Sequence, residues 1–230
     1  MTEQNIFVPE ILYEDNHIIA INKKPSQIVQ GDKTGDEPLV ELLKKFIKQR
    51  DNKPGDVFLG VVHRLDRPVG GVMIFAKTSK SLTRLNELFR TGEVHKTYLA
   101  IVKKTPPKEH DTLIHYLIRN EKLNKSFAYD MPKGDAKKAH LEYTVAGKSD
   151  NYTLLNIRLF TGRHHQIRCQ LAAIGSPIKG DLKYGFDRSN KDASISLIAH
   201  SISFIHPVKK EMINIVAPFP ETDVWQFFKL

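Results

Sequence analysis

The chain has 230 residues, of which 40% are hydrophobic and 27% are charged, so it can bury one sizeable core as an ordinary soluble protein does. Lysine and arginine total 35 against 26 acidic residues. The resulting charge of +9 favours a polyanionic partner such as a nucleic acid, although charge alone does not separate this from a protein that is merely basic. The single cysteine, Cys169, excludes an internal disulfide and a cysteine-based zinc site. With no signal pattern and no apolar run of membrane-spanning length, we expect a soluble cytoplasmic protein with no membrane partner.

The first third of the chain predicts strands around one helix. Residues 11–21 are apolar with a polar cluster in their middle, which indicates two short strands and a turn, and a polar loop over 26–36 follows. Asp36 and Pro38 are start signals for a helix. Its apolar residues recur at helical spacing, at Leu39, Leu42, Leu43, Phe46 and Ile47. Two apolar runs of strand length, 57–62 and 72–76, flank an irregular segment that contains Pro68, Gly70 and Gly71.

The rest of the chain is also rich in strands. Ser79 is expected to cap a helix through Phe89. The lysine-rich segment 119–138 is expected to be an exposed hairpin or loop, and 163–174 a helix that Gly175 stops. The buried side of that helix would hold Ile167, Leu171 and Ile174. Strands are predicted over 97–102, 112–118, 141–145, 153–160, 195–204 and 212–216, with a short helix around 224–228.

Strands outnumber helices and often follow one another directly, without regular alternation. We therefore expect an α+β fold, built on a mixed, largely antiparallel sheet with flanking helices. No internal repeat, linker or low-complexity tract divides the chain, so residues 1–230 are expected to form a single domain.

The signatures of serine hydrolases, P-loop enzymes, dinucleotide enzymes and HExxH zinc proteases are missing from the sequence. The first candidate site is instead the segment HRLD at 63–66. Together with the following Arg67, this segment places two cations and a carboxylate in a turn between two buried strands. Loops in such a position often present functional groups. Asp66 can equally hydrogen-bond the backbone of the turn. On physical grounds alone the two interpretations are balanced.

Two further segments carry candidate residues. In GRHHQIR at 162–168, His164 and Arg168 would share a cationic helix face with His165. Adjacent histidines diverge by about 100° on a helix, which disfavours a metal site and leaves a solvated basic face as the alternative. In VHKTYLA at 94–100, Tyr98 lies between apolar neighbours, where it is either core or a stacking platform for a base.

Each of these segments is a weak signal alone, but their combination is specific for one family. HRLD, AKT at 76–78, KTYLA at 96–100, GRHHQIR and GDLKYG at 180–185 resemble, in order and approximate spacing, the RluA-type pseudouridine synthases. The opening strands, KKAHLEY at 137–143 and FIHPV at 204–208 extend the likeness from about Ile11 to the C-terminus. The resemblance implies the pseudouridine synthase catalytic fold. It also implies an isomerase that converts uridine in structured ribosomal or transfer RNA to pseudouridine, as a monomer, without DNA, cofactor or metal.

The resemblance also assigns roles to individual residues. Asp66 would be the catalytic aspartate, and Arg168 would hold it ionised, since a cation within ~4–6 Å favours the carboxylate. The uridine must leave the RNA stack, so Tyr98 is expected to stack on the flipped base and Arg64 to fill the gap. Leu197 would supply an apolar wall. Candidate contacts to the RNA backbone are His164, His165, Lys183 and the segment 119–138.

The chain departs from the family pattern in two places. Val69, Gly70 and Gly71 stand where a Thr-Ser-Gly type sequence is common, and Ile198 stands where Leu-His-Ala is frequent. The small N-terminal RNA-binding domain of many members is not expected, because few residues precede the first strand. Two rival functions remain: a catalytically inactive RNA-binding module of the same fold, and a cofactor-free glycosidase, in which two carboxylates would be expected.

Overall fold

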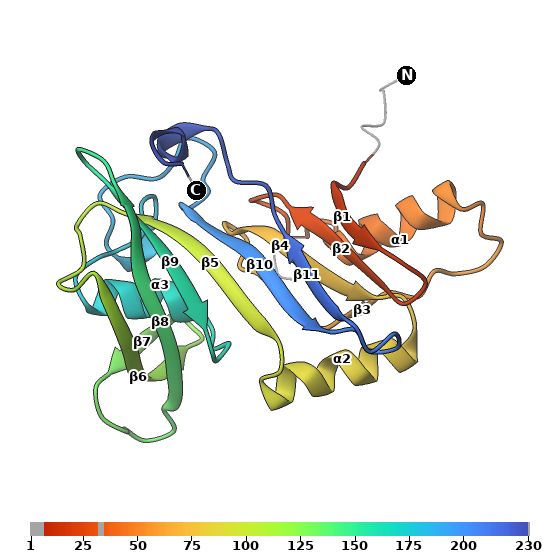
Figure 1. Cartoon of the computed structure of the whole chain (residues 1–230), viewed down its shortest axis with the longest axis horizontal. Coiled ribbons are helices and arrows are strands. Elements are labelled where there is room, and N and C mark those ends of the chain that lie inside the picture. Colours follow the sequence, from red (N-terminus) through yellow and green to blue (C-terminus); the bar gives the residue numbers. More distant parts are fainter. Residues whose placement is uncertain (1–6, 32–34, 230) are drawn as a thin grey trace.

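The computed structural model describes residues 7–31 and 35–229, which form a long twisted sheet with flanking helices (Figure 1). The helices are α1 (Leu39–Arg50), α2 (Ser79–Thr91) and α3 (Gln166–Ala173), with short 3-10 helices η1 (Leu182–Tyr184) and η2 (Asp223–Phe227). The strands are β1 (Ile11–Glu14), β2 (Ile18–Lys23), β3 (Gly60–Val61), β4 (Gly70–Ala76), β5 (His95–Val102), β6 (His110–Asn120), β7 (Lys125–Tyr129), β8 (Lys137–Lys148), β9 (Thr153–Leu159), β10 (Leu197–Ile205) and β11 (Met212–Val216).

The strand order of the sheet is β1-β2-β4-β10-β5-β9-β8-β6-β7, with β3 pairing with β4 and β11 with β10. Among the described strands, the one parallel pairing is that of β4 with β10, where Gly70 and Gly71 lie opposite Ile198 and Ala199. The prediction of an α+β fold with a mixed, largely antiparallel sheet is confirmed. This short parallel pairing joins two half-sheets, and the residues before β4 lie beside the junction.

The core explains why the predicted elements form. In α1 the residues Leu39, Leu43 and Ile47, at helical spacing, are fully buried. The hairpin of β1 and β2 closes because the Asp15 carboxylate accepts hydrogen bonds from the backbone N–H groups of His17 and Ile18, at 2.8 and 2.9 Å. In the other half-sheet α3 lies against β6 and β7 and covers one face.

Several element boundaries differ from the predictions. The predicted strand 57–62 is paired at Gly60–Val61 alone. Thr78, not Ser79, caps α2, because the Thr78 hydroxyl accepts a hydrogen bond from the Ser81 backbone N–H at 3.1 Å. Residues 119–138 do form a hairpin, but β7 makes it a regular part of the sheet.

The helix predicted over 163–174 begins at Gln166. His165 adopts a left-handed backbone conformation, with φ of 52°, which ends the preceding turn. The side-chain oxygen of Gln166 accepts hydrogen bonds from the Thr161 hydroxyl and the Arg163 N–H, at 2.8 and 3.0 Å. His164 and His165 therefore lie in an ordered turn, and the shared helix face predicted for His164 and Arg168 was wrong.

Of the predicted polar loop 26–36, residues 32–34 lie outside the described part of the chain. No helix within the described ranges is long and apolar enough to cross a membrane.

Candidate active site

Asp66 lies in a tight turn between β3 and β4, and His63 of the same motif anchors that turn. The Val69 N–H donates to the Asp66 carbonyl at 3.0 Å. His63 Nε2 accepts a hydrogen bond from the Ile74 N–H at 3.0 Å, and its ring stacks on Phe89 of α2 at 5.0 Å. Burial lowers the pKa of His63 to about 3, so its ring stays neutral and can accept this bond. His63 is thus a structural residue of the motif.

Lys23, which the sequence analysis did not single out, holds the Asp66 turn from behind. Its side chain is fully buried, and its ammonium donates to the carbonyl of Val69 at 2.7 Å and to those of Asp66 and Arg67 at 3.4 and 3.3 Å. Burial lowers the pKa of Lys23 to about 7, against the opposing effect of the Asp66 charge. Several carbonyls of one turn thereby converge on a single donor, which restrains the backbone that carries Asp66.

Gly71 stands at the glycine position of the family's Thr-Ser-Gly type sequence, where β4 meets β10. It has φ of 109°, and a Cβ there would lie 2.2 Å from the Ala199 carbonyl oxygen. Only glycine therefore allows β4 to meet β10 at this point. Ile198, the second departure, packs with Leu99 and Trp225 in a cluster apart from the one that holds Tyr98. Ile198 is not among the residues that line the Asp66 pocket.

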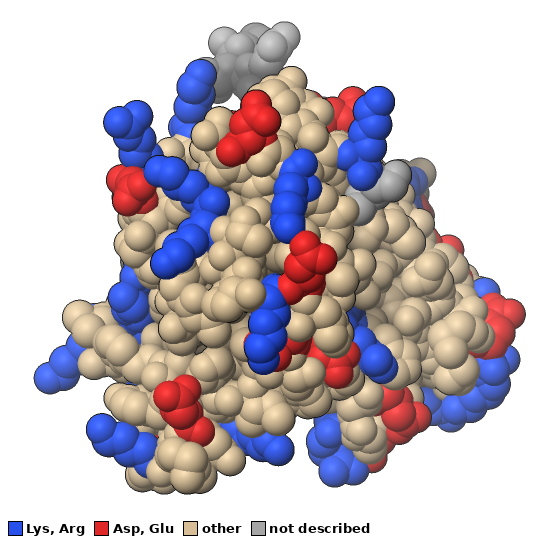
Figure 2. All heavy atoms as spheres, turned by 60° about the vertical axis from the view of Figure 1, so that its left-hand side comes forward, with Lys and Arg blue, Asp and Glu red and all other residues tan. Residues whose placement is uncertain are grey.

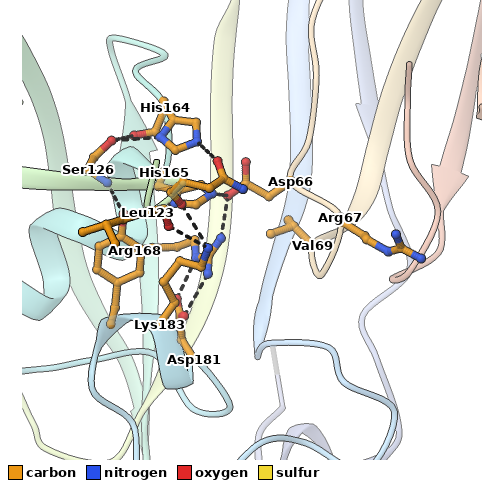
Figure 3. A network of polar contacts seen from close by, with 12 residues as sticks. Asp66, Arg67, Val69, Leu123, Ser126, His164, His165, Arg168, Asp181 and Lys183 are labelled. Atoms are coloured by element: carbon orange, nitrogen blue, oxygen red, sulfur yellow. Dashed lines mark hydrogen bonds and ion pairs between the residues drawn. The ribbon is translucent and has the colours of Figure 1, made fainter. Parts of the chain in front are cut away.

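Arg168 joins Asp66 to a second carboxylate, Asp181 (Figure 3). Its guanidinium donates two hydrogen bonds to Asp181, at 2.6 and 2.8 Å, and one to Asp66 at 3.1 Å. Arg168 and Asp181 are 5% and 1% exposed, respectively. Burial works against the charge of Arg168, but Asp181 and Asp66 outweigh it and raise the pKa above its usual value. The bidentate pair with Asp181 fixes the plane of the guanidinium and leaves one edge for Asp66.

His165 lies on another side of the same carboxylate. Its Nε2 is 3.6 Å from the Asp66 carboxylate oxygen, just beyond hydrogen-bond distance, and its Nδ1 is 3.1 Å from the Tyr184 hydroxyl. The Tyr184 oxygen already accepts the Ser126 N–H at 2.8 Å, so its own proton is free to bind Nδ1. Burial, followed by the charge of Arg168, lowers the pKa of His165 to about 2. A neutral His165 with its proton on Nε2, directed at Asp66, follows from this arrangement.

His164 fastens the β6–β7 hairpin to the site. Its Nδ1 lies 2.9 Å from the Ser126 hydroxyl and its Nε2 lies 3.1 Å from the Asn124 side-chain oxygen. The ring stacks on that of His165, with centroids 3.8 Å apart. Lys183 donates to the Asn124 carbonyl at 3.0 Å and holds the same turn. Both His164 and Lys183, predicted as contacts to RNA, therefore already bind the hairpin.

The Asp66 side chain, 29% exposed, opens into a pocket of about 100 Å³. Tyr98 of β5 and Leu197 of β10 line it, and Arg64 is exposed beside it. The other residues of its wall are Leu65, Val69, Leu159, Gly162, Arg163, His165, Gln166, Ile167 and Arg168. A larger hollow of about 760 Å³, with mixed charges, shares Leu197 with this pocket but does not include Asp66.

The predicted site residues, apart from His164, line one pocket. Asp66, Arg64, Tyr98, Arg168 and Leu197 line one pocket, although they lie up to 133 positions apart in the chain. The buried His165 faces the carboxylate, and His164 lies behind it. Sequence reasoning missed Lys23, Asp181 and Tyr184; the last two belong to GDLKYG, which was noted only as part of the resemblance. No cluster of three or more potential metal-ligating side chains lies within the described ranges.

Comparisons with known proteins identify a family for the chain. The family model for RNA pseudouridylate synthase matches residues 17–173. The chain is 34% identical over 221 residues to a protein named ribosomal large subunit pseudouridine synthase C of Buchnera aphidicola, covering 93% of this chain and 68% of that one. It is 33% identical to ribosomal large subunit pseudouridine synthase D of Xylella fastidiosa, covering 92% and 66%.

The fold has solved counterparts. The structure of human RNA pseudouridylate synthase domain containing 4 superimposes with a TM-score of 0.77 at 24% identity, covering 92% of this chain and 88% of that one. Human RNA pseudouridylate synthase domain containing 1 gives a TM-score of 0.73 at 21% identity, covering 96% and 88%. At these identities the likeness establishes the fold. Together with the family match over most of the chain and the relatives named above, it places the protein in the RluA-type family of RNA pseudouridine synthases, which are isomerases.

Proposed function

We propose that Asp66 is the catalytic carboxylate with which this protein isomerises uridine in ribosomal RNA. The observation that carries the proposal is the Asp66 carboxylate held at the mouth of a pocket by Arg168, which the buried Asp181 in turn fixes. Because the groups around the Asp66 carboxylate are already in position, the site needs little reorganisation when the reaction begins.

The chemistry needs one ionised carboxylate and a place for the base. The bond between uracil N1 and ribose C1′ breaks, the base turns, and C5 bonds to C1′; C5 loses a proton and N1 gains one, with no net redox change. Asp66 either attacks the sugar or removes a proton from it, and both roles require the ionised form. Arg168 stabilises that form, and the neutral His165 lies with its Nε2 3.6 Å from the same carboxylate.

The pocket suits a base that has left its helix. Extrusion of a nucleotide costs a few kcal/mol, and stacking on an aromatic ring returns roughly 1–3 kcal/mol. Tyr98 offers such a ring in the pocket that contains Asp66, and Leu197 offers an apolar wall. Arg64 at the exposed rim is suited to fill the vacated position in the RNA or to contact a phosphate.

The substrate class follows from charge and relatives. Lysine and arginine side chains spread over the face in Figure 2, with acidic ones interspersed, which suits a phosphate backbone. The relatives named above are synthases of the ribosomal large subunit, so large-subunit RNA is the first substrate to test. The proposal includes a cytoplasmic location, where ribosomal RNA would be modified, and a monomer, which is supported by a pocket lined by residues of one chain.

The test compares Asp66→Asn with the control Asp56→Asn, which alters a fully exposed carboxylate. Ribosomal and transfer RNA from cells that lack the protein is incubated with each purified variant, and pseudouridine is mapped. Asp66→Asn is expected to form none while keeping RNA affinity within a few fold, because cationic side chains provide most of the binding. Wild-type turnover is expected to be insensitive to EDTA. Turnover by Asp66→Asn would refute the assignment, and release of free uracil by the wild type would favour the glycosidase.

A further inference from the structure

The half-sheet that carries the catalytic pocket has a second face. The side chains that alternate away from α3 include Ile114, Tyr116 and Ile118 of β6, together with Phe127 and Tyr129 of β7. His140 of β8 and Phe160, just after β9, continue the row. We call these seven residues the stacking face. Ile118 pairs across the strands with Phe127, and Tyr116 with Tyr129, so the apolar side chains form a continuous ladder.

The described residues leave the stacking face uncovered. The opposite face buries Leu113, Leu141 and Ile157 in the main core. Farther along the outer face, Leu99, Ile101 and Leu154 are covered by Trp225 and Phe228. In Figure 1 α3 lies behind β8 and β9, whereas the C-terminal segment reaches only the upper end of these strands. Ile114 and Phe127 remain 45% and 37% exposed. The open face of an antiparallel sheet is normally polar, so an apolar ladder there indicates a ligand.

Cations surround these rings. Lys133 lies 4.7 Å from the centroid of Tyr129, Lys125 lies 5.7 Å from that of Phe127, and Arg158 lies 4.7 Å from that of Phe160. Lys138 and Arg163 add exposed charges at the same edge, against an acidic Glu142. Beyond Phe160 the sheet is hollowed by about 320 Å³, with polar walls that include His95, His110, Asn156 and Arg158.

We infer that the stacking face binds single-stranded RNA, and that it contacts nucleotides flanking the uridine modified at Asp66. Alternating aromatic and cationic side chains on an open sheet suit unpaired bases and the phosphates between them. A folded protein partner would gain little from five cations spread among the rings. The inference deepens the proposed function and rests on it for the identity of the RNA.

The stacking face and the catalytic pocket meet at the end of β9. Leu159 lines the pocket, and the next residue, Phe160, stacks on His140 of the stacking face, with centroids 4.2 Å apart. Arg163 also lines the pocket, and its Nε donates to the Lys138 carbonyl at 3.1 Å. A strand that leaves the pocket would pass Arg163 and continue around the end of β9 to reach Phe160 on the opposite face of the sheet.

The test uses a fluorescein-labelled dodecamer of uridine at fixed salt, with binding measured by anisotropy. The triple variant Tyr116→Ser/Phe127→Ser/Tyr129→Ser removes three rings from the stacking face. A matched control, Phe58→Ser/Met212→Ser/Val216→Ser, removes three exposed apolar side chains elsewhere. We expect the first variant to bind at least tenfold more weakly, since each lost base stack weakens binding by about fivefold or more, and the control to bind within twofold of wild type. Circular dichroism confirms that each variant is folded.

Crosslinking locates the strand. A dodecamer that contains 4-thiouridine is expected to crosslink to β6, β7 or Phe160 as well as to the pocket. Unchanged affinity in the first triple variant, or crosslinks confined to the pocket, would overturn the inference. That failure is distinct from failure of the proposed function, which is read from Asp66→Asn in the modification assay. In that assay the triple variant is expected to keep the wild-type kcat at saturating RNA and to raise KM.

Discussion

Replacing Arg168 should separate the stability of the site from its chemistry. Arg168→Met leaves Asp181, 1% exposed, as a buried carboxylate without its bidentate partner. Breaking a buried ion pair on one side costs about 3–5 kcal/mol, a large part of the roughly 5–15 kcal/mol that stabilises a typical domain. Asp66 loses the donor at 3.1 Å as well, and loss of one such contact to the reacting centre lowers kcat by about 10²–10³-fold.

A second substitution distinguishes these two effects. Arg168→Met/Asp181→Leu replaces the whole buried pair by apolar side chains, which is often neutral or stabilising, so most of the lost free energy of unfolding should return. Turnover should not return, because Asp66 still lacks its cation. Urea unfolding followed by circular dichroism measures the first quantity, and release of tritium from RNA labelled at uridine C5 measures the second. A double variant with near-normal turnover would refute a direct role for Arg168 at Asp66.

Three smaller changes test the rest of the site. Tyr98→Phe keeps the ring and should reduce turnover less than Tyr98→Ala; equal defects in kcat/KM would mean that the hydroxyl, not stacking, matters. Lys23→Met should lower kcat more than tenfold, because the carbonyls of the Asp66 turn lose their shared donor. Lys24→Met, at an exposed lysine, should leave kcat unchanged. Equal kcat values for the two variants would show that the turn keeps its conformation without Lys23. The folded pKa of His63, about 3, lies below its unfolded value near 6.5, so the unfolded chain binds the extra proton as pH falls below 6.5. Wild-type unfolding free energy should therefore drop by about 1.4 kcal/mol at pH 5.5 from this residue, and His63→Gln should show a correspondingly smaller drop in urea titrations at pH 7.5 and 5.5.

The sequence predicted the elements better than it predicted their roles. Periodicity located the buried side of α1 and the strands of both half-sheets, because burial on one face leaves a repeating pattern. It could not place the start of α3, which depends on the left-handed backbone of His165 and on the side chain of Gln166. Such side-chain contacts leave no periodic signal.

The sequence motifs identified residues that line the site, but not the residues that hold them in position. Asp66 and Arg168 were chosen because they belong to segments that resemble a family, and the structure brings them within 3.1 Å. Nothing local in the sequence indicated that Lys23, at the end of an apolar strand, would donate to three carbonyls of the Asp66 turn. His63 belongs to the same motif but received no role from the sequence, and its hydrogen bond from the Ile74 N–H and its stacking on Phe89 make it part of the scaffold.

The central position of β10 has a consequence for synthesis of the chain. Of the eleven strands within the described ranges, β10 is the tenth to leave the ribosome, but it is inserted between β4 and β5. Until it arrives, both of those strands present open edges that can pair with other chains. The two half-sheets can acquire local structure early, whereas the wall that Leu197 gives the pocket cannot exist before residue 197 has been translated. A nascent chain that stalls before residue 197 is therefore expected to be inactive and prone to aggregation.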